Sequence, residues 1–567
     1  MNPLLKLTLA TALALAPMAA SSQCLLTGEG QQRQLSVDGK PYIILGGELG
    51  NSSASSEADI KRIFPKLNNM GLNTVLVPAY WDLMEPREGE YDFSLIDAAI
   101  REAEANNLKV VFLWFGAWKN SMSCYAPEWF KTDTRRFPRA RTRQGKPLEI
   151  ASAFSPDVLK ADQKAFENLL RHISETDTRH TVIMLQIENE IGMLESARDF
   201  SPEATRLFNA PVPDKLTDFI KAHKSTLHPE LLDRWKAAGA KTSGSWPDIF
   251  GTDVYAEEIF MAYHYAAYVE RLAQTARRYT RMPLYVNAAL NSRGRQPGQY
   301  PSAGPLAHLI DIWRCAAPTL DFISPDIYDP GFEQWVERYA ILGNPLFVPE
   351  MRLCEANGAQ AFYAFGEHRA LGVSPFSIEN GNEQGKLKMA YDALRSLTPI
   401  LSTDAPRHGM LFESSADERQ WLEDGVRITA RHFFTLPWDS RATDGSPWPA
   451  AGAMLIRLAP MEYILAGSGV VMTFQSQDEA EASAAAQAQL GEDGFATAGS
   501  KPDAAKAARW NAKSRVGIVS VDQVEVLPDG QLRRIRRLNG DEDHQGRHAR
   551  IGVDNFQVLH IKLYKYE

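Results

Sequence analysis

Short apolar runs alternate with amphipathic helical patterns from residue 42 to about residue 379 of this chain. Such alternation is typical of parallel βα units. Eight runs predict strands, at Tyr42–Leu49, Thr74–Tyr80, Lys109–Phe115, Val182–Ile187, Leu284–Ala288, Asp321–Tyr328, Leu346–Pro349 and Val373–Ile378. Eight strands favour a closed (β/α)₈ barrel over an open doubly wound sheet, whose glycine-rich Gly-x-Gly-x-x-Gly turn does not occur here.

Helices are predicted between these strands, with a last one at Lys386–Leu401. Their apolar positions recur with helical spacing at Ala58–Met70, Leu95–Asn106, Val158–Glu175, Ala256–Tyr279 and Phe332–Leu342. The long interval from Ile191 to Met282 predicts more than one helix, its first half forming an elaborated loop on one face of the barrel.

The pattern changes after residue 407, where apolar and polar positions alternate between Gly, Pro and Asp turns. This alternation, at Val426–Phe434, Gly467–Phe474, Val516–Val526 and Phe556–Tyr566, predicts a C-terminal antiparallel β-sandwich. The Ala-, Gln- and acid-rich stretch Gln477–Ala508 predicts a helical excursion or a mobile loop within it. We therefore divide the chain into residues 1–22, a barrel domain at 23–402 and a β-sandwich at 403–567.

Residues 1–22 have the pattern of a secretory signal peptide: Lys6, an apolar run from Leu7 to Ala16, then small residues. We expect an exported protein, periplasmic or secreted, with no membrane insertion, because no apolar run approaches the roughly 20 residues that span a bilayer. A lipid anchor on Cys24 is the alternative, disfavoured because Gln23, before it, is not small.

Composition narrows the range of partners. The 567 residues are 44% hydrophobic and 23% charged, as in a globular protein, and the net charge of −9 gives no long-range attraction for nucleic acid. Four cysteines without Cys-x-x-Cys spacing argue against a zinc site and predict at most one or two disulfides. The Asp541–His548 segment suits a polar turn better than a metal site, and the basic run Arg533–Arg537 suits a solvated strand.

Two carboxylates, Glu190 and Glu350, close the fourth and seventh apolar runs. Active sites of (β/α)₈ barrels lie at the carboxyl ends of the strands, so both acids would face a substrate. Two carboxylates about 5 Å apart can cleave a glycosidic bond with retention, one protonating the leaving oxygen and the other attacking the sugar. The pair therefore predicts glycosidase chemistry.

Two motifs carry a family resemblance. The run Gln186-Ile187-Glu188-Asn189-Glu190-Ile191-Gly192 resembles the Gln-x-Glu-Asn-Glu-x-Gly motif of glycoside hydrolase family 35, the β-galactosidases of a large (β/α)₈ clan. The segment from Trp81 to Phe93 resembles that family's Trp-x-x-x-Glu-Pro-x-x-Gly-x-Tyr-x-Phe segment after strand two. The two matches occur in the family's order.

The resemblance implies roles for four residues. Glu190 would be the general acid/base, Glu350 the nucleophile, Asn189 the partner of the sugar 2-hydroxyl, and Tyr328 a hydrogen-bond donor to the nucleophile. Glu188, one layer below, is expected to orient the site. We expect no metal and no cofactor, and a neutral oligosaccharide or polysaccharide as the partner; the oligomeric state stays open.

The chain also departs from the family pattern. Gly46-Gly47-Glu48-Leu49-Gly50-Asn51 replaces Ser-Gly-x-x-His-Tyr, Pro349-Glu350-Met351 replaces Ser-Glu-Phe, and Trp118-Lys119-Asn120 replaces Cys-Ala-Glu-Trp. We carry over a polar contact for Asn120 only, and expect an aromatic platform for sugar rings that includes Trp81 and Trp118. The chain resembles a divergent bacterial branch that includes enzymes acting on galactosylated xyloglucan oligosaccharides.

These features predict a retaining exo-β-galactosidase. Two alternatives stay open. One is another retaining glycosidase of the same clan, a β-glucosidase or an endo-acting glucanase or mannanase. The other is a carbohydrate-binding protein on a degenerate barrel, which would have no need of two acids at strand ends.

Overall fold

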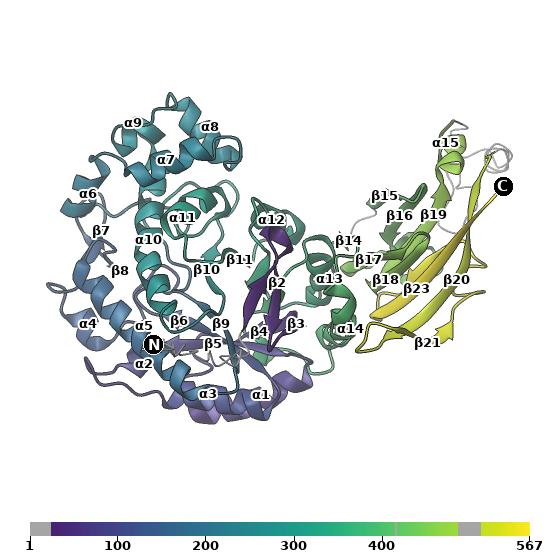
Figure 1. Cartoon of the computed structure of the whole chain (residues 1–567), viewed down its shortest axis with the longest axis horizontal. Helices are drawn as coiled ribbons and strands as arrows, with labels where there is room; N and C mark the ends of the chain where they lie inside the picture. Colours follow the sequence, from purple (N-terminus) through teal and green to yellow (C-terminus); the bar gives the residue numbers. More distant parts are fainter. Residues whose placement is uncertain (1–23, 414–416, 486–511) are drawn as a thin grey trace, which may run out of the picture.

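The computed structural model describes residues 24–413, 417–485 and 512–567. The predicted signal peptide, and most of the stretch Gln477–Ala508, lie outside these ranges. A helix-coated barrel and a group of antiparallel sheets lie side by side along the longest axis (Figure 1). Among the described residues, no helix is long and apolar enough to cross a bilayer.

Eight parallel strands close into the predicted barrel, so the predicted fold class is confirmed. Each carries a nearly continuous buried run, as strands covered on both faces do. In chain order they are β4 (Ile44–Glu48), β5 (Thr74–Tyr80), β6 (Lys109–Phe115), β9 (Val182–Gln186), β10 (Leu284–Ala289), β11 (Phe322–Ile327), β12 (Phe347–Met351) and β13 (Gly372–Pro375).

Helices cover the outside of the barrel, most of them where the apolar spacing predicts them. These are α1 (Glu57–Asn69), α3 (Ser94–Ala105), α5 (Pro156–Thr176), α10 (Val254–Ala276), α12 (Phe332–Tyr339) and α14 (Lys386–Leu401). Four helices occupy the predicted elaborated interval after β9: α6 (Pro202–Phe208), α7 (Asp214–Ala222), α8 (Pro229–Ala237) and α9 (Trp246–Phe250). Smaller elements are β1 (Leu25–Thr27), β2 (Gln34–Val37), β3 (Lys40–Tyr42), α2 (Trp81–Met84), α4 (Glu128–Thr132), β7 (Arg139–Arg141), β8 (Pro147–Ala151) and α11 (Ile310–Ala316).

Two antiparallel sheets form the C-terminal part. The larger has the order β14 (Arg407–Phe412), β17 (Ala451–Ala459), β18 (Glu462–Ser468), β23 (Gln557–Tyr566), β20 (Arg515–Val526) and β21 (Leu532–Arg537). The smaller has the order β15 (Glu418–Glu423), β16 (Val426–His432), β19 (Val470–Ser476) and β22 (Ala549–Ile551). One apolar cluster draws residues from both sheets, as in a sandwich. Helix α15 (Gln477–Ala485) follows β19.

The alternating stretch Gly467–Phe474 spans the end of β18 and most of β19. Gly469 adopts a left-handed backbone with φ of +73° and turns the chain, so that β18 and β19 belong to different sheets. Glycine reaches this region without steric cost, which is why the turn needs only one residue.

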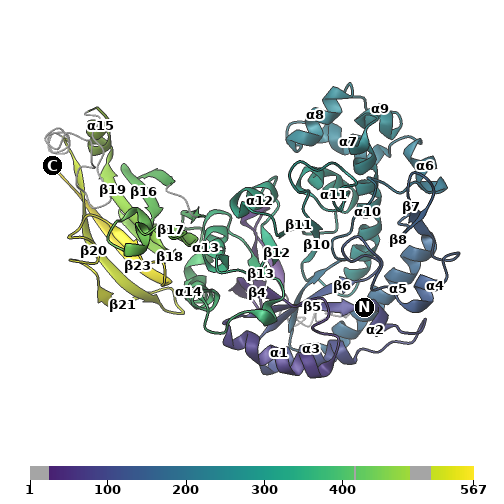
Figure 2. The ribbon, with the colours of Figure 1, turned by 180° about the vertical axis from the view of Figure 1, so that it is seen from behind.

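The part of the larger sheet formed by β14, β17 and β18 is buried on both faces. Met410, Leu455 and Tyr463 point into the sandwich core, whereas their neighbours Leu411, Met454 and Ile464 join the barrel core. Side chains alternate across a strand, so one sheet can serve two cores. Helices α13 (Asn357–Glu367) and α14 lie between barrel and sheet in both views (Figure 2).

All four cysteines carry free thiols. Cys24 is only 2% exposed, packed in the barrel core, and burial raises the pKa of its thiol to about 12. The lipid-anchor alternative and the export prediction stay predictions from the sequence.

Candidate active site

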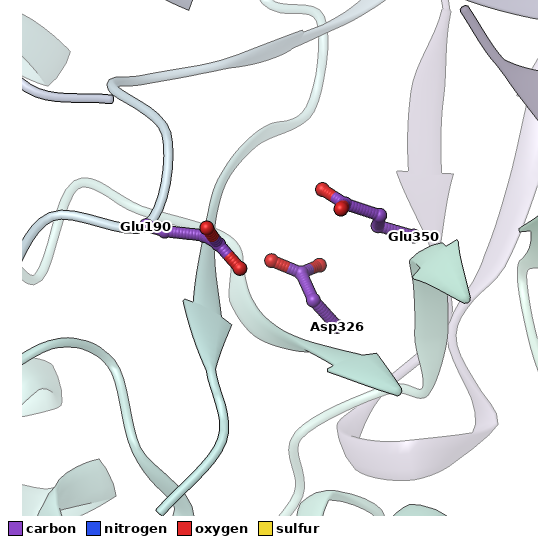
Figure 3. A group of neighbouring side chains, drawn as sticks. All are labelled: Glu190, Asp326 and Glu350. Atoms are coloured by element: carbon purple, nitrogen blue, oxygen red, sulfur yellow. The ribbon is translucent and has the colours of Figure 1, made fainter. Parts of the chain in front are cut away.

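Three carboxyl groups converge at the carboxyl ends of the barrel strands: Glu190, Asp326 and Glu350 (Figure 3). One oxygen from each lies within 4.8 Å of the others. Glu190 follows the end of β9, whereas Asp326 and Glu350 lie within β11 and β12, in register with each other. The barrel thus brings together the two acids predicted from sequence, although they are far apart along the chain.

Glu190 is held by groups from one neighbouring strand, β10, and from the loop after β6. Its backbone N–H donates to Asn287 Oδ1 at 3.0 Å, and the Asn120 amide donates to its carboxylate. Asn287 Nδ2 in turn donates to Asp326 Oδ2 at 2.7 Å. Glu190 has a left-handed φ of +47°, a conformation that non-glycine residues adopt mainly where surrounding contacts enforce it. These contacts fix the direction of its side chain.

Tyr328 donates its hydroxyl hydrogen bond to Glu350 Oε1, which is the contact predicted from the resemblance. Such a bond stabilises a negative charge on the carboxylate. Glu350 is 3% exposed, and its second oxygen accepts no hydrogen bond within the protein. That oxygen is therefore a buried acceptor whose hydrogen-bonding capacity is unused.

Burial, together with the nearby charge of Glu350, raises the pKa of Glu190 to about 7. At neutral pH a large fraction of Glu190 therefore carries a proton. A protonated acid beside a carboxylate held by a hydroxyl donor is the arrangement that acid-assisted nucleophilic attack requires.

Three charged residues of the site were missed by sequence reasoning: Glu48, Asp326 and Lys119. All are at most 2% exposed. Burial and the charge of Glu350 raise the pKa values of Glu48 and Asp326 well above their usual ranges. Glu48 and Asp326 end the first and sixth barrel strands, so the criterion that selected Glu350 could have found them.

Lys119 is the cation among these acids. Burial lowers the pKa of its ammonium, but the charges of Glu350 and Glu190 outweigh burial, and the net shift is upward. Its Nζ lies 5.1 Å from the Phe115 ring centroid. Lys119 therefore offsets part of the negative charge of the carboxyl cluster.

Several buried polar atoms at the site have no hydrogen-bond partner within the protein. They include both oxygens of Glu48, both amide atoms of Asn189, and one oxygen each of Asp326 and Glu350. Buried polar groups without partners are rare and costly in proteins. A ligand with several hydroxyl groups would satisfy both donors and acceptors in this set.

Glu188 lies beneath this layer and holds the loop after β6. Its carboxylate accepts hydrogen bonds from the backbone N–H of Trp118 at 2.8 Å and of Ala117 at 3.4 Å. Burial and the charge of Asp162 raise the pKa of Glu188 well above its usual range. Because β9 ends at Gln186, simple strand alternation does not set its direction, but its contacts agree with an orienting role.

The two predicted tryptophans do not form an open platform. Trp81 is fully buried, packs against Trp114, Trp129 and Phe130, and donates its Nε1 hydrogen bond to Glu85 Oε2 at 2.8 Å. Trp118 is also fully buried, with its ring edge-on to Tyr265 and Tyr268. Both rings therefore belong to the buried packing of the structure, and a sugar contact for Trp81 and Trp118 stays a prediction.

The same carboxyl triad is the one set of side chains in the described ranges with the spacing of a metal site. The Asp541–His548 segment gives no such group within those ranges. A metal-free mechanism stays a prediction.

Fold and site together have the layout of a barrel glycoside hydrolase: two close carboxyls with divided environments, at the carboxyl ends of opposed strands. Residues 51–249 match a family model described as "Beta-galactosidase", that of glycoside hydrolase family 42. Residues 387–550 match a domain of unknown function. The matching model is that of family 42, so the finer prediction of family 35 is not supported. The predicted similarity to β-galactosidases holds for the matched barrel segment.

Curated relatives match over similar lengths. A beta-galactosidase of Xanthomonas manihotis is 31% identical over 198 residues, covering 33% of this chain and 30% of that protein. Beta-galactosidase-1-like protein 3 of Mus musculus is 27% identical over 167 residues, covering 29% of this chain and 24% of that protein. The chain thus spans less than a third of the length of these relatives.

Solved structures give weaker matches over a longer span. The beta-galactosidase from Marinomonas ef1 has a TM-score of 0.45 and 13% identity, covering 64% of this chain and 62% of that one. The enzyme from Halorubrum lacusprofundi has a TM-score of 0.43 and 15% identity, covering 64% and 58%.

Proposed function

We propose that this chain is a retaining exo-β-galactosidase that removes terminal β-galactosyl residues from oligosaccharides. Glu190 would protonate the glycosidic oxygen, and Glu350 would attack the anomeric carbon. The observation that carries this proposal is the approach of the two carboxyls to within 4.8 Å. Retaining enzymes place their carboxyls about 5 Å apart, whereas inverting enzymes need roughly 6.5–9.5 Å to admit a water.

The sugar class rests on the similarity of residues 51–249 to β-galactosidases. Exo action is supported by burial: both acids are at most 4% exposed, which suits a single terminal sugar better than a chain lying across an open cleft. Galactosylated xyloglucan fragments are the proposed substrates. Export, predicted from residues 1–22, would place the enzyme where such fragments occur outside the cytoplasm.

The test is hydrolysis of nitrophenyl glycosides by the wild type and by Glu350→Gln. We expect cleavage of the β-galactoside in preference to the β-glucoside and β-mannoside. The variant keeps the side-chain volume but lacks the nucleophile, so turnover should fall by several orders of magnitude. In Glu350→Gly, which vacates the space of the carboxylate, azide should restore turnover by forming a glycosyl azide of inverted configuration.

Two results would contradict the proposal. If Glu350→Gln kept near-wild-type rates, Glu350 would not be the nucleophile. If the enzyme preferred a β-glucoside or β-mannoside, the proposed substrate would be wrong and one of the alternative glycosidase activities would take its place. Folding of the variant is checked by circular dichroism and its unfolding temperature.

A further inference from the structure

Trp438 differs from the other tryptophans in the part of the chain that the structure describes, because nearly half of it is exposed. Its exposed fraction is 48%, and no other described tryptophan is among the exposed large apolar side chains. It lies between two short turns of the β-sandwich, Phe433–Thr435 and Ser440–Ala442. A lone exposed apolar residue needs no explanation, but this indole has a built setting.

Three side chains hold the indole. His544 and His548 lie 4.8 Å and 5.8 Å from it between ring centroids, and the guanidinium of Arg550 lies 5.1 Å from its ring centroid. The two imidazoles are nearly parallel, and Arg550 is itself fixed by donating to the Asp541 carbonyl at 2.8 Å. The indole is therefore held in place before any ligand arrives, which lowers the entropy cost of binding.

Charged groups form a polar rim near it. Arg441 pairs with Asp439 at 2.6 Å and with Asp554 at 2.9 Å, and these side chains are partly exposed. A rigid aromatic face beside exposed donors and acceptors suits a ligand with an apolar face and polar edges. A pyranose ring has this character, since its C–H groups gather on one face and its hydroxyls on its edge.

The chain path connects this surface to a helix that packs on the barrel. Asp554 is followed closely by Phe556, whose ring packs on Phe362 of α13 at 5.5 Å and meets Gly358 in the first turn of that helix. Helix α13 begins just after β12, the strand that carries Glu350. The rim therefore connects, through direct contacts, to the carboxyl-end face of the barrel.

We propose that Trp438, flanked by Arg550 and the Arg441 rim, binds the glycan chain of a polymeric substrate outside the catalytic site. This inference rests on the proposed function in that the ligand is a neutral glycan. The site would hold the polymer near the barrel mouth without touching the scissile bond. It therefore predicts an effect on polymers and none on small substrates.

Affinity electrophoresis through gels containing soluble xyloglucan tests binding directly. The proteins carry Glu350→Gln so that the polymer stays intact. We expect Trp438→Ala to weaken retardation roughly tenfold in apparent affinity, as loss of one central contact residue does. Trp438→Tyr should retain most of the retardation. Tyr564→Ala is the matched control, because Tyr564 is 46% exposed in the same domain but outside this cluster.

Kinetics in the catalytically intact background give the second readout. Trp438→Ala should leave kcat/KM for nitrophenyl β-galactoside unchanged and raise KM several-fold for galactosylated xyloglucan. The inference would be overturned if xyloglucan did not retard the protein with Trp438 intact, or if Trp438→Ala did not reduce the retardation. It would also be overturned if Tyr564→Ala reduced the retardation equally. If retardation depends on Trp438 but no galactoside is cleaved, the glycan site stands and the proposed function falls.

Discussion

Glu190 is the residue whose proton limits the proposed reaction. Burial and the charge of Glu350 raise its pKa to about 7, so the protonated form is lost as pH rises through that value. We expect kcat/KM to fall on the alkaline side of about pH 7. A pH profile measured with an unactivated galactoside checks this, because its leaving group needs full protonation.

Glu190→Ala should separate the role of the acid from that of the nucleophile. Without the acid, poor leaving groups should slow by about 10²–10⁴, whereas activated nitrophenyl leaving groups should slow far less. The alkaline limb at about pH 7 should also disappear for the activated substrate. If Glu190→Ala reduced the rates of both kinds of substrate equally, Glu190 would not be the general acid.

Glu48 should cost stability as well as aid binding. Burial and the charge of Glu350 hold its pKa well above 4.5 in the folded protein, so the folded state binds more protons than the unfolded chain. Its contribution to stability is present below about pH 4.5 and is lost as pH rises toward the raised value. Glu48→Gln should therefore raise the unfolding temperature at pH 8 more than at pH 5, in thermal scans at both pH values.

The effect of Glu48→Gln on substrate binding tests whether Glu48 also contacts the sugar. If both Glu48 oxygens accept bonds from sugar hydroxyls, Glu48→Gln should also raise KM for the galactoside. A variant with unchanged KM would place Glu48 outside the substrate contacts, even if the stability shift appears.

At this scale the sequence identified Glu190, Glu350 and the neighbours Tyr328 and Asn120, but not the other charged residues around them. Glu350 lies at the end of β12 and Glu190 follows the end of β9, so barrel closure determines that they meet. Asp326 and Lys119 lay within motifs whose neighbours, Tyr328 and Asn120, drew attention instead. The burial of Trp81 depends on packing from α4 and its neighbours, which no local pattern contains.

At the scale of elements, α13 shows why periodicity fails for a fully enclosed helix. Nearly all its residues are buried, from Asn357 to Gly366, because it lies between the barrel and the larger sheet. A helix with no polar face gives no helical period to detect. The barrel strands were found because their apolar runs stand between clear helical patterns.

The contact between α13 and the sheet depends on glycine. A Cβ on Gly452 would lie 2.2 Å from the Ala359 carbonyl oxygen, far inside contact distance. Gly452→Ala should therefore destabilise the protein by about 1–3 kcal/mol, the usual cost of overpacking, in denaturant unfolding.

Gly552→Ala is the matched control for that prediction. Nothing lies within 4 Å of a Cβ built there, and its backbone is not left-handed, so its stability should stay level or rise slightly. Similar losses at both positions would contradict the packing argument.

At the scale of the whole molecule, barrel closure predicts the stereochemistry. Strands β9 and β12 bring Glu190 and Glu350 to the same mouth, with one carboxyl oxygen of each within 4.8 Å of the other, a spacing that suits a retaining pair better than an inverting one. The first sugar released from a β-galactoside should be the β anomer. A proton NMR time course before mutarotation decides, and early α anomer would rule out the retaining mechanism.

The part of the larger sheet formed by β14, β17 and β18 has two buried faces, one in the sandwich and one against the barrel helices. A chain ending after α14 would leave the apolar surfaces of α13 and α14 open to water, and an isolated sandwich would expose the row that includes Leu411, Met454 and Ile464. Either part alone would expose this apolar surface to water, and we expect it to aggregate. The boundary between barrel and sandwich is thus a change of architecture within one packed unit, and we expect the two parts to unfold together.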